Sequence, residues 1–199
     1  MSYSNKRWML FVDGEGFTIR AQKIAEEKGL CIDGYKRYMK DTYFWMEGMI
    51  FSTFFKANYN EKWPFEEDAI RQYFYTTVVG DAKEILETKR KLRIMQFEPV
   101  VFNKKKKDDK SKAVDITLAS HMLSHAFRNN YDAAVLVAGD GDYVPLVEEV
   151  KRLGKMVWLF FFSKPYGLNE NLYLACDMFK PMEKWLITTL EKLQTSEKT

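Results

Sequence analysis

Short apolar runs and segments with helical periodicity alternate along most of this chain. The apolar runs do not change polarity from one residue to the next, so the strands they predict would be buried on both faces. Residues 71–79, for example, are mainly β-branched and aromatic, a composition typical of strands. We predict five strands, at residues 7–12, 71–79, 98–103, 132–138 and 156–162.

Between these runs, apolar residues recur at spacings of three and four, as in an amphipathic helix. In one such segment, Leu118, Ala119, Met122 and Ala126 form a single stripe. Strands that alternate with helices predict an α/β fold with a mostly parallel sheet, covered by helices on both faces. The predicted helices are residues 17–28, 82–92, 114–127, 143–153 and 183–193.

Residues 30–68 do not follow this alternation. They are crowded with aromatic side chains, among them Trp45, Phe54 and Trp63. We predict a mainly helical insertion between the first two strands, within one domain that spans residues 1–199. The insertion is a candidate lid, a candidate surface for a homo-oligomer, or extra core, and extra core is the favoured interpretation.

The composition is that of a globular protein, with 46% hydrophobic and 30% charged residues. The longest apolar run, residues 156–162, is too short to cross a bilayer, and the N-terminal residues lack the layout of a signal peptide. We therefore expect a cytoplasmic protein without a membrane partner. Cys31 and Cys176 have no CxxC spacing, which favours two reduced thiols.

Four aspartates lie where the predicted strands end or where helices begin. Asp13 follows the first strand, Asp140 follows the fourth, and Asp142 comes two residues later. Asp115 occupies the first turn of a helix, on the stripe that faces the sheet. Sites in parallel α/β sheets form beyond the carboxyl ends of the strands, so we expect these carboxylates to converge. Carboxylates this close repel one another unless a cation lies between them. Because Mg²⁺ and Mn²⁺ prefer oxygen ligands, the four aspartates predict a site for one of these ions.

Three of the four aspartates also have a simpler interpretation. Asp13 could be a turn residue before Gly14, Asp115 could interact only with the helix dipole, and Asp142 could only cap a helix. Their common position at one edge of the sheet favours the metal site for the set as a whole. His121 and His125 are four residues apart, a spacing that zinc uses, but no HExxH motif or third ligand accompanies them. We interpret these histidines as surface or packing residues.

A basic run directly precedes Asp115. The segment "KKKKDDKSK" (104–112) holds six lysines, and the simplest interpretation is a solvated loop. Because the loop leads into the acidic group, its lysines would lie beside a metal site. This arrangement would allow them to bind the phosphodiester backbone of a nucleic acid. The net charge of +3 does not decide the matter. The candidate nucleic-acid-binding residues are Lys104, Lys105, Lys106, Lys107, Lys110 and Lys112.

Three segments carry a resemblance to a known family. "MLFVDGEGF", "KAVDITLASHML" and "AAVLVAGDGDYVPLVEEVKRLGKMVWLF" resemble the NYN domain, in the LabA-like branch of the PIN-like nuclease superfamily. The resemblance covers residues 7–20 and 98–180. It implies a Rossmann-like α/β/α fold with strand order 3-2-1-4-5 and a metal-dependent nuclease acting mostly on RNA.

The resemblance also implies roles for individual residues. The metal-binding and catalytic acids of the family correspond to Asp13, Asp115, Asp140 and Asp142, and Lys112 matches the lysine that precedes the V-D pair. This chain departs from the family pattern at two places. Gly16 replaces an asparagine, and Ala138 replaces a serine.

Three functions from different classes follow. The favoured one is a Mg²⁺- or Mn²⁺-dependent endoribonuclease, in which the four aspartates hold the metal and Glu15 is an additional candidate ligand or base. Lys112 and the neighbouring lysines would hold phosphate groups. The alternative is a non-catalytic module of the same fold that binds a nucleic acid or a nucleotide, which the two departures favour. A protein-interaction role for the aromatic insertion ranks third.

Overall fold

The computed structural model describes residues 6–30, 69–104 and 112–196. The described residues form one sheet of six strands in the order β3-β2-β1-β4-β5-β6, and every neighbouring pair is parallel. The strands are β1 (Trp8–Asp13), β2 (Arg71–Val79), β3 (Glu98–Lys104), β4 (Ala133–Val137), β5 (Met156–Phe161) and β6 (Met178–Pro181).

Helices connect the strands. The α-helices are α1 (Gly14–Glu27), α3 (Ala82–Ile94), α4 (Lys112–Phe127), α5 (Val144–Arg152), α6 (Glu170–Ala175) and α7 (Glu183–Ser196). Two 3-10 turns, η1 (Gly141–Tyr143) and η2 (Lys164–Tyr166), precede α5 and α6.

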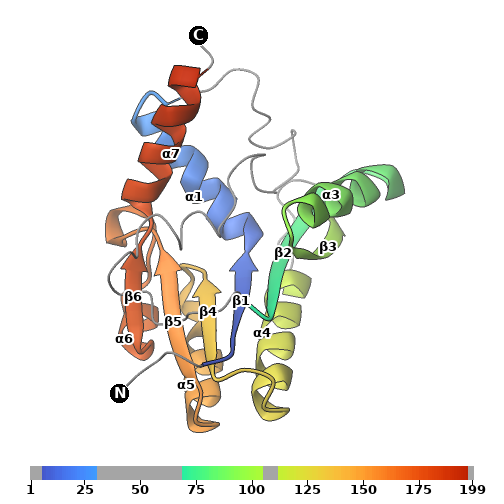
Figure 1. Cartoon of the computed structure of the whole chain (residues 1–199), viewed down its shortest axis with the longest axis vertical. Coiled ribbons are helices and arrows are strands. Elements are labelled where there is room, and N and C mark those ends of the chain that lie inside the picture. Colours follow the sequence, from blue (N-terminus) through green and yellow to red (C-terminus); the bar gives the residue numbers. More distant parts are fainter. Residues whose placement is uncertain (1–5, 31–68, 105–111, 197–199) are drawn as a thin grey trace.

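The helices cover the two faces of the sheet to make three layers. Helices α1 and α7 contact each other, and α4 and α5 form a second contacting pair across the sheet (Figure 1). Strand β1 is central, with β2 on one side and β4 on the other. The strand order therefore reverses between β1 and β4, the place at which ligand sites form in parallel α/β folds.

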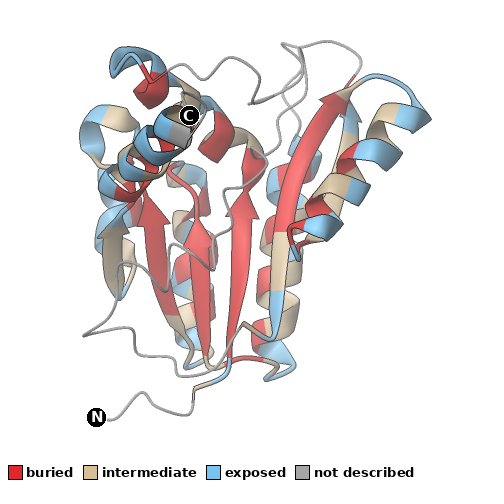
Figure 2. Ribbon diagram, turned by 45° about the horizontal axis from the view of Figure 1, so that its top comes forward, coloured by how far each residue is buried: buried red, intermediate tan, exposed pale blue. Residues whose placement is uncertain are grey.

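The core is built from the central strands. All six residues of β1 and all five of β4 are buried, which explains why their sequences are apolar without alternation (Figure 2). Aromatic side chains fill much of the interior, and Phe11, Phe74 and Trp158 are each at most 1% exposed. This continuous packing holds the ends of β1 and β4 in fixed positions.

The predicted fold class and strand order 3-2-1-4-5 are confirmed, and β6 extends the sheet beyond β5. The sixth strand was missed because it is a four-residue edge strand that ends in Pro181, and none of its residues is buried. Helix α1 begins at Gly14 rather than at residue 17, since Asp13 caps it.

Several predictions concern residues outside the described ones. Nearly all of the predicted insertion at 30–68 lies there, as do Lys105, Lys106, Lys107 and Lys110. No helix among the described residues is long and apolar enough to cross a membrane.

Candidate metal and nucleic-acid site

Asp13 joins the central strand to the first helix. It is the last residue of β1 and the N-cap of α1, where its carboxylate accepts a hydrogen bond from the backbone N–H of Gly16 at 3.1 Å. A Cβ atom at residue 16 would lie 2.6 Å from Oδ2 of Asp13. Gly16 thus allows the carboxylate to lie against the first turn of α1, which a side chain would prevent in this conformation.

The charge state of Asp13 is strongly perturbed. Burial raises its pKa to about 7, against the lowering effect of the hydrogen bond from Gly16. The negative charges of Asp115, Glu15 and Asp140 raise this pKa further. Acids from three different parts of the sequence therefore act on one buried carboxylate.

Asp140 reaches the same edge of the sheet from β4. Val137 at the end of β4 pairs with Val12 of β1, so the chain that continues from β4 passes beside Asp13. The carboxylate of Asp140 accepts a hydrogen bond from the N–H of Asp142 at 3.1 Å and caps η1. Helix α5 has no side-chain cap, so the capping role considered for Asp142 is not observed, and Asp142 is exposed.

Asp115 approaches from α4 and is held by a tyrosine. The hydroxyl of Tyr143, a buried residue at the end of η1, donates a hydrogen bond to Oδ1 of Asp115 at 2.9 Å. Partial burial raises the pKa of Asp115, and the charges of Asp140, Glu15 and Asp142 add to this increase. The hydrogen bond from Tyr143 opposes it. Sequence reasoning missed Tyr143, although its place directly after the D-G-D motif was the available signal.

The four aspartates suit a divalent cation by donor type and by charge. Their oxygens are hard ligands. A doubly charged ion would offset the burial of Asp13, which is the main cause of its raised pKa, and the smaller repulsion from Asp115 and Asp140. Within the described residues, no three Asp, Glu, His or Cys side chains already form a group that could hold a metal ion. The carboxylates share one edge of the sheet, and the structure does not draw them into a complete coordination shell.

Glu15 has its own fixed partners. Lys104 at the end of β3 forms an ion pair with Oε1 of Glu15, and the hydroxyl of Thr77 donates a hydrogen bond to Oε2 at 2.7 Å. Lys104 is 5% exposed. Lys104 is therefore not a flexible, solvated side chain, because its charge is buried against Glu15, and its role in binding nucleic acid stays a prediction.

The other described lysine of the basic run remains available. Lys112 is exposed in the first turn of α4, three residues before Asp115. The two histidines of α4 are packing residues, as we predicted. Tyr73 and Tyr75 contact them by hydrogen bonds of 3.1 Å to His125 and His121, respectively.

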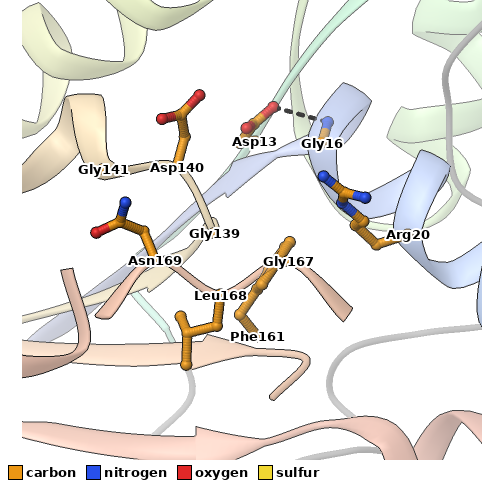
Figure 3. Close-up of a pocket in the computed structure, with 10 residues that line it drawn as sticks. All are labelled: Asp13, Gly16, Arg20, Gly139, Asp140, Gly141, Phe161, Gly167, Leu168 and Asn169. Carbon is orange, nitrogen blue, oxygen red and sulfur yellow. Dashed lines mark hydrogen bonds between the residues drawn. The ribbon is translucent and has the colours of Figure 1, made fainter. Parts of the chain in front are cut away.

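A hollow of about 390 Å³ opens beside Asp13 and Asp140 (Figure 3). Arg20 of α1 and Asn169, which caps α6, also border it, and sequence reasoning missed both. Arg20 lies one helical turn after Gly16, so its direction toward Asp13 could have been inferred from helical spacing. Asn169 approaches only because the chain after β5 returns to the site. The full lining is Asp13, Gly16, Arg20, Gly139, Asp140, Gly141, Phe161, Gly167, Leu168 and Asn169.

The NYN domain family matches residues 7–183, which is most of the chain. The protein therefore belongs to the NYN domain family, within the PIN-like nuclease superfamily.

One solved structure has the same fold. It is a protein of unknown function from Vibrio parahaemolyticus, with a TM-score of 0.58 and 19% sequence identity over 89% of this chain and 93% of that one. At this identity the likeness concerns the fold alone. No curated protein shows significant sequence similarity to this chain.

Proposed function

We propose that this protein is a divalent-metal-dependent endoribonuclease of the LabA-like branch. The observation that carries the proposal is the perturbed carboxylate of Asp13, whose pKa is raised by burial and by the charges of Asp115, Glu15 and Asp140. A buried acid surrounded by other acids is costly to keep without a function, and such groups cluster at catalytic sites. Membership of the NYN family supports nuclease chemistry at this place.

Different residues of the site have different proposed roles. Asp13, Asp115, Asp140 and Asp142 are the proposed ligands of Mg²⁺ or Mn²⁺, an ion that would lower the pKa of a bound water and stabilise negative charge at phosphorus. Tyr143 orients Asp115 through its 2.9 Å hydrogen bond.

Glu15 is proposed as an additional metal ligand or proton acceptor. Its two carboxylate oxygens are already engaged by Lys104 and Thr77, so its orientation is set before the substrate arrives. Lys112, with the lysines of the basic run that follow Lys104, is proposed to bind the phosphate groups of RNA.

A cleavage assay tests the proposal. Wild type, Asp140→Asn and the control Glu27→Gln are incubated with labelled single-stranded RNA and DNA in Mn²⁺, Mg²⁺ or EDTA. The control also replaces a carboxylate with an amide, but at an exposed residue that pairs only loosely with Lys23, at 3.8 Å. Wild type and the control should cleave RNA with metal and not in EDTA, and Asp140→Asn should be inactive. RNA and DNA left intact by wild type under every condition would contradict the proposal.

The second candidate is a non-catalytic module that binds RNA or a nucleotide at the same place. Two observations favour it: Gly16 lets Asp13 turn back onto α1, and Ala138, buried at 0% exposure, offers no hydroxyl near the site. Under this alternative, wild type and Asp140→Asn bind RNA equally well and neither cleaves it.

The organisation of the rest of the chain stays a prediction. We propose one NYN domain over residues 1–199, with 30–68 as an insertion and as the candidate surface for a homo-oligomer. Sedimentation of the wild type and of Trp45→Ala checks the oligomer, which would dissociate on this substitution if the insertion forms the contact.

A further inference from the structure

The hollow beside Asp13 is lined by acidic, apolar and basic side chains on different sides. The carboxylates of Asp13 and Asp140 border it on one side, and Leu168 and Phe161 on another (Figure 3). The guanidinium of Arg20 extends into the space between Gly16 and Gly167. A cation, two acids and an apolar wall thus enclose one small volume.

Arg20 lines the hollow without an ion pair to any described residue. Within the described part of the chain it takes part in none of the salt bridges, although two carboxylates border the same hollow. Its guanidinium lies against the backbone of Gly167, where an added Cβ would be 2.6 Å from Nε and 2.8 Å from Cζ. Gly167 also has a φ of +99°, a conformation that favours glycine. Gly167 therefore leaves room for the guanidinium of Arg20, and among the described residues no salt bridge occupies its hydrogen-bond donors.

The neighbouring pocket has the opposite character. It shares Asp140, Gly141 and Asn169 with the hollow, but its other charged lining residues are Asp142 and Glu148, both acidic. Arg20 is the cationic residue lining either pocket among the described residues. A phosphate group that approaches Asp140 thus finds a complementary charge only on the Arg20 side.

The volume limits what enters. About 390 Å³ is within the range of pockets that bind a small molecule, and a base that is paired and stacked in a duplex has no access to such a pocket. We propose that the Arg20 hollow binds one unpaired nucleotide of single-stranded nucleic acid, with a phosphate of that nucleotide on the guanidinium of Arg20. The inference rests on the proposed function, because it assigns a substrate subsite to the same edge of the sheet.

Equilibrium binding in EDTA tests the subsite without cleavage. The probe is a fluorescently labelled single-stranded RNA of mixed sequence, and the same strand in a duplex serves for comparison. The proteins are wild type, Arg20→Ala, Arg20→Lys and the control Lys23→Ala, which removes a positive charge from the same helix at an exposed position. Anisotropy is measured over a series of salt concentrations.

Wild type should bind the single strand more tightly than the duplex. Arg20→Ala should weaken single-strand binding by roughly tenfold, and the slope of log K against log salt should fall by about 0.7, the value for one lost phosphate contact. Arg20→Lys should keep the slope and lose part of the affinity, because lysine retains the charge without the planar fork. Lys23→Ala should bind like the wild type.

Gly167→Ala is the second variant, and it leaves Arg20 in the sequence. The new Cβ should displace the guanidinium, and an alanine at φ +99° also strains the backbone of the hollow, so binding should fall at least as far as in Arg20→Ala while circular dichroism reports that the fold is kept. An affinity and a salt slope for Arg20→Ala equal to those of Lys23→Ala would overturn the subsite, and so would equal binding of the single strand and the duplex.

The two proposals fail in different ways. A wild type that binds RNA through Arg20 but never cleaves it refutes the nuclease and leaves the subsite standing. A wild type that cleaves RNA, with unchanged binding in Arg20→Ala, refutes only the subsite.

Discussion

The two ends of the central strand pair β1–β4 carry similar acids in opposite surroundings. At the start of these strands, Arg7 donates hydrogen bonds to both carboxylate oxygens of Asp132, at 3.0 and 3.3 Å. The pKa of Asp132 is lowered, mainly by this side-chain contact. At the other end, Asp13 and Asp140 lie beside each other, and the described salt bridges include neither. The pKa of Asp13 is raised to about 7.

The difference separates an acid that stabilises the fold from acids that await a ligand. Asp132 joins two neighbouring strands and has its charge balanced within the chain. Asp13 is more deeply buried and faces further negative charge, an arrangement that lowers the stability of the metal-free protein. Four substitutions test this comparison.

The largest expected effect is on catalysis at the unbalanced end. Asp115→Asn should lower kcat for RNA by at least about 100-fold, because even the outer-shell partners of metal ligands contribute 10- to 100-fold. Asp132→Asn is the matched control, with the same chemical change at the balanced end, and should keep its activity. Initial rates in Mn²⁺ with labelled RNA measure both. Equal losses in the two variants would mean that the ends do not differ in function.

Asp13→Asn should stabilise the metal-free protein at pH 8. The unfolded Asp13 ionises near 3.8 and the folded one at about 7, so the folded state holds its proton more tightly and stability falls as the pH rises between these values. A neutral asparagine avoids this loss, with a gain of roughly 2–4 kcal/mol at pH 8 and a much smaller one at pH 4. Urea denaturation in EDTA at the two pH values measures it. A gain independent of pH would show that charge is not its cause.

Tyr143→Phe should act through Asp115. Loss of the hydroxyl removes the 2.9 Å hydrogen bond and leaves the carboxylate less oriented. We expect roughly a tenfold loss of affinity for Mn²⁺, the lower limit for a partner of a metal ligand. Calorimetric titration with Mn²⁺ measures the affinity, and Tyr166→Phe, on η2, is the control. Equal Mn²⁺ affinities in wild type and Tyr143→Phe would remove Tyr143 from the site.

The smallest effect concerns the balanced end. The folded pKa of Asp132 is lowered, so its ion pair contributes stability above about pH 4, and this is lost as the pH falls through the folded value. Because Arg7 and Asp132 are partly exposed, Asp132→Asn should cost less than about 1 kcal/mol at pH 7 and still less at pH 2. Urea denaturation at both pH values measures this. A stabilising effect at pH 7, like that expected for Asp13→Asn, would abolish the contrast between the two ends.

Local pattern was sufficient to predict most of the fold. Buried strands of a parallel sheet need apolar residues on both faces, and the runs at β1, β4 and β5 satisfy that need without reference to the rest of the chain. Strand β6 does not, because a short edge strand has few buried residues and so leaves little trace in the hydrophobic pattern.

The sequence by itself determined which acids stand at the ends of strands, since Asp13 and Asp140 each follow an apolar run. It did not determine their neighbours. Lys104 belongs to a run of lysines that looks solvated, and only the strand order β3-β2-β1 brings it against Glu15.

Arg20 and Tyr143 are likewise assigned to the site only by contacts between segments that are remote in sequence. Arg20 lies against Gly167, and Tyr143 is bonded to Asp115, 28 positions away. Hydrophobic periodicity indicates which residues are buried, because hydrophobicity is a property of each side chain by itself. Charge balance depends on what the tertiary fold places within a few ångströms, so only the tertiary structure decided which of these ionisable groups are partnered within the chain.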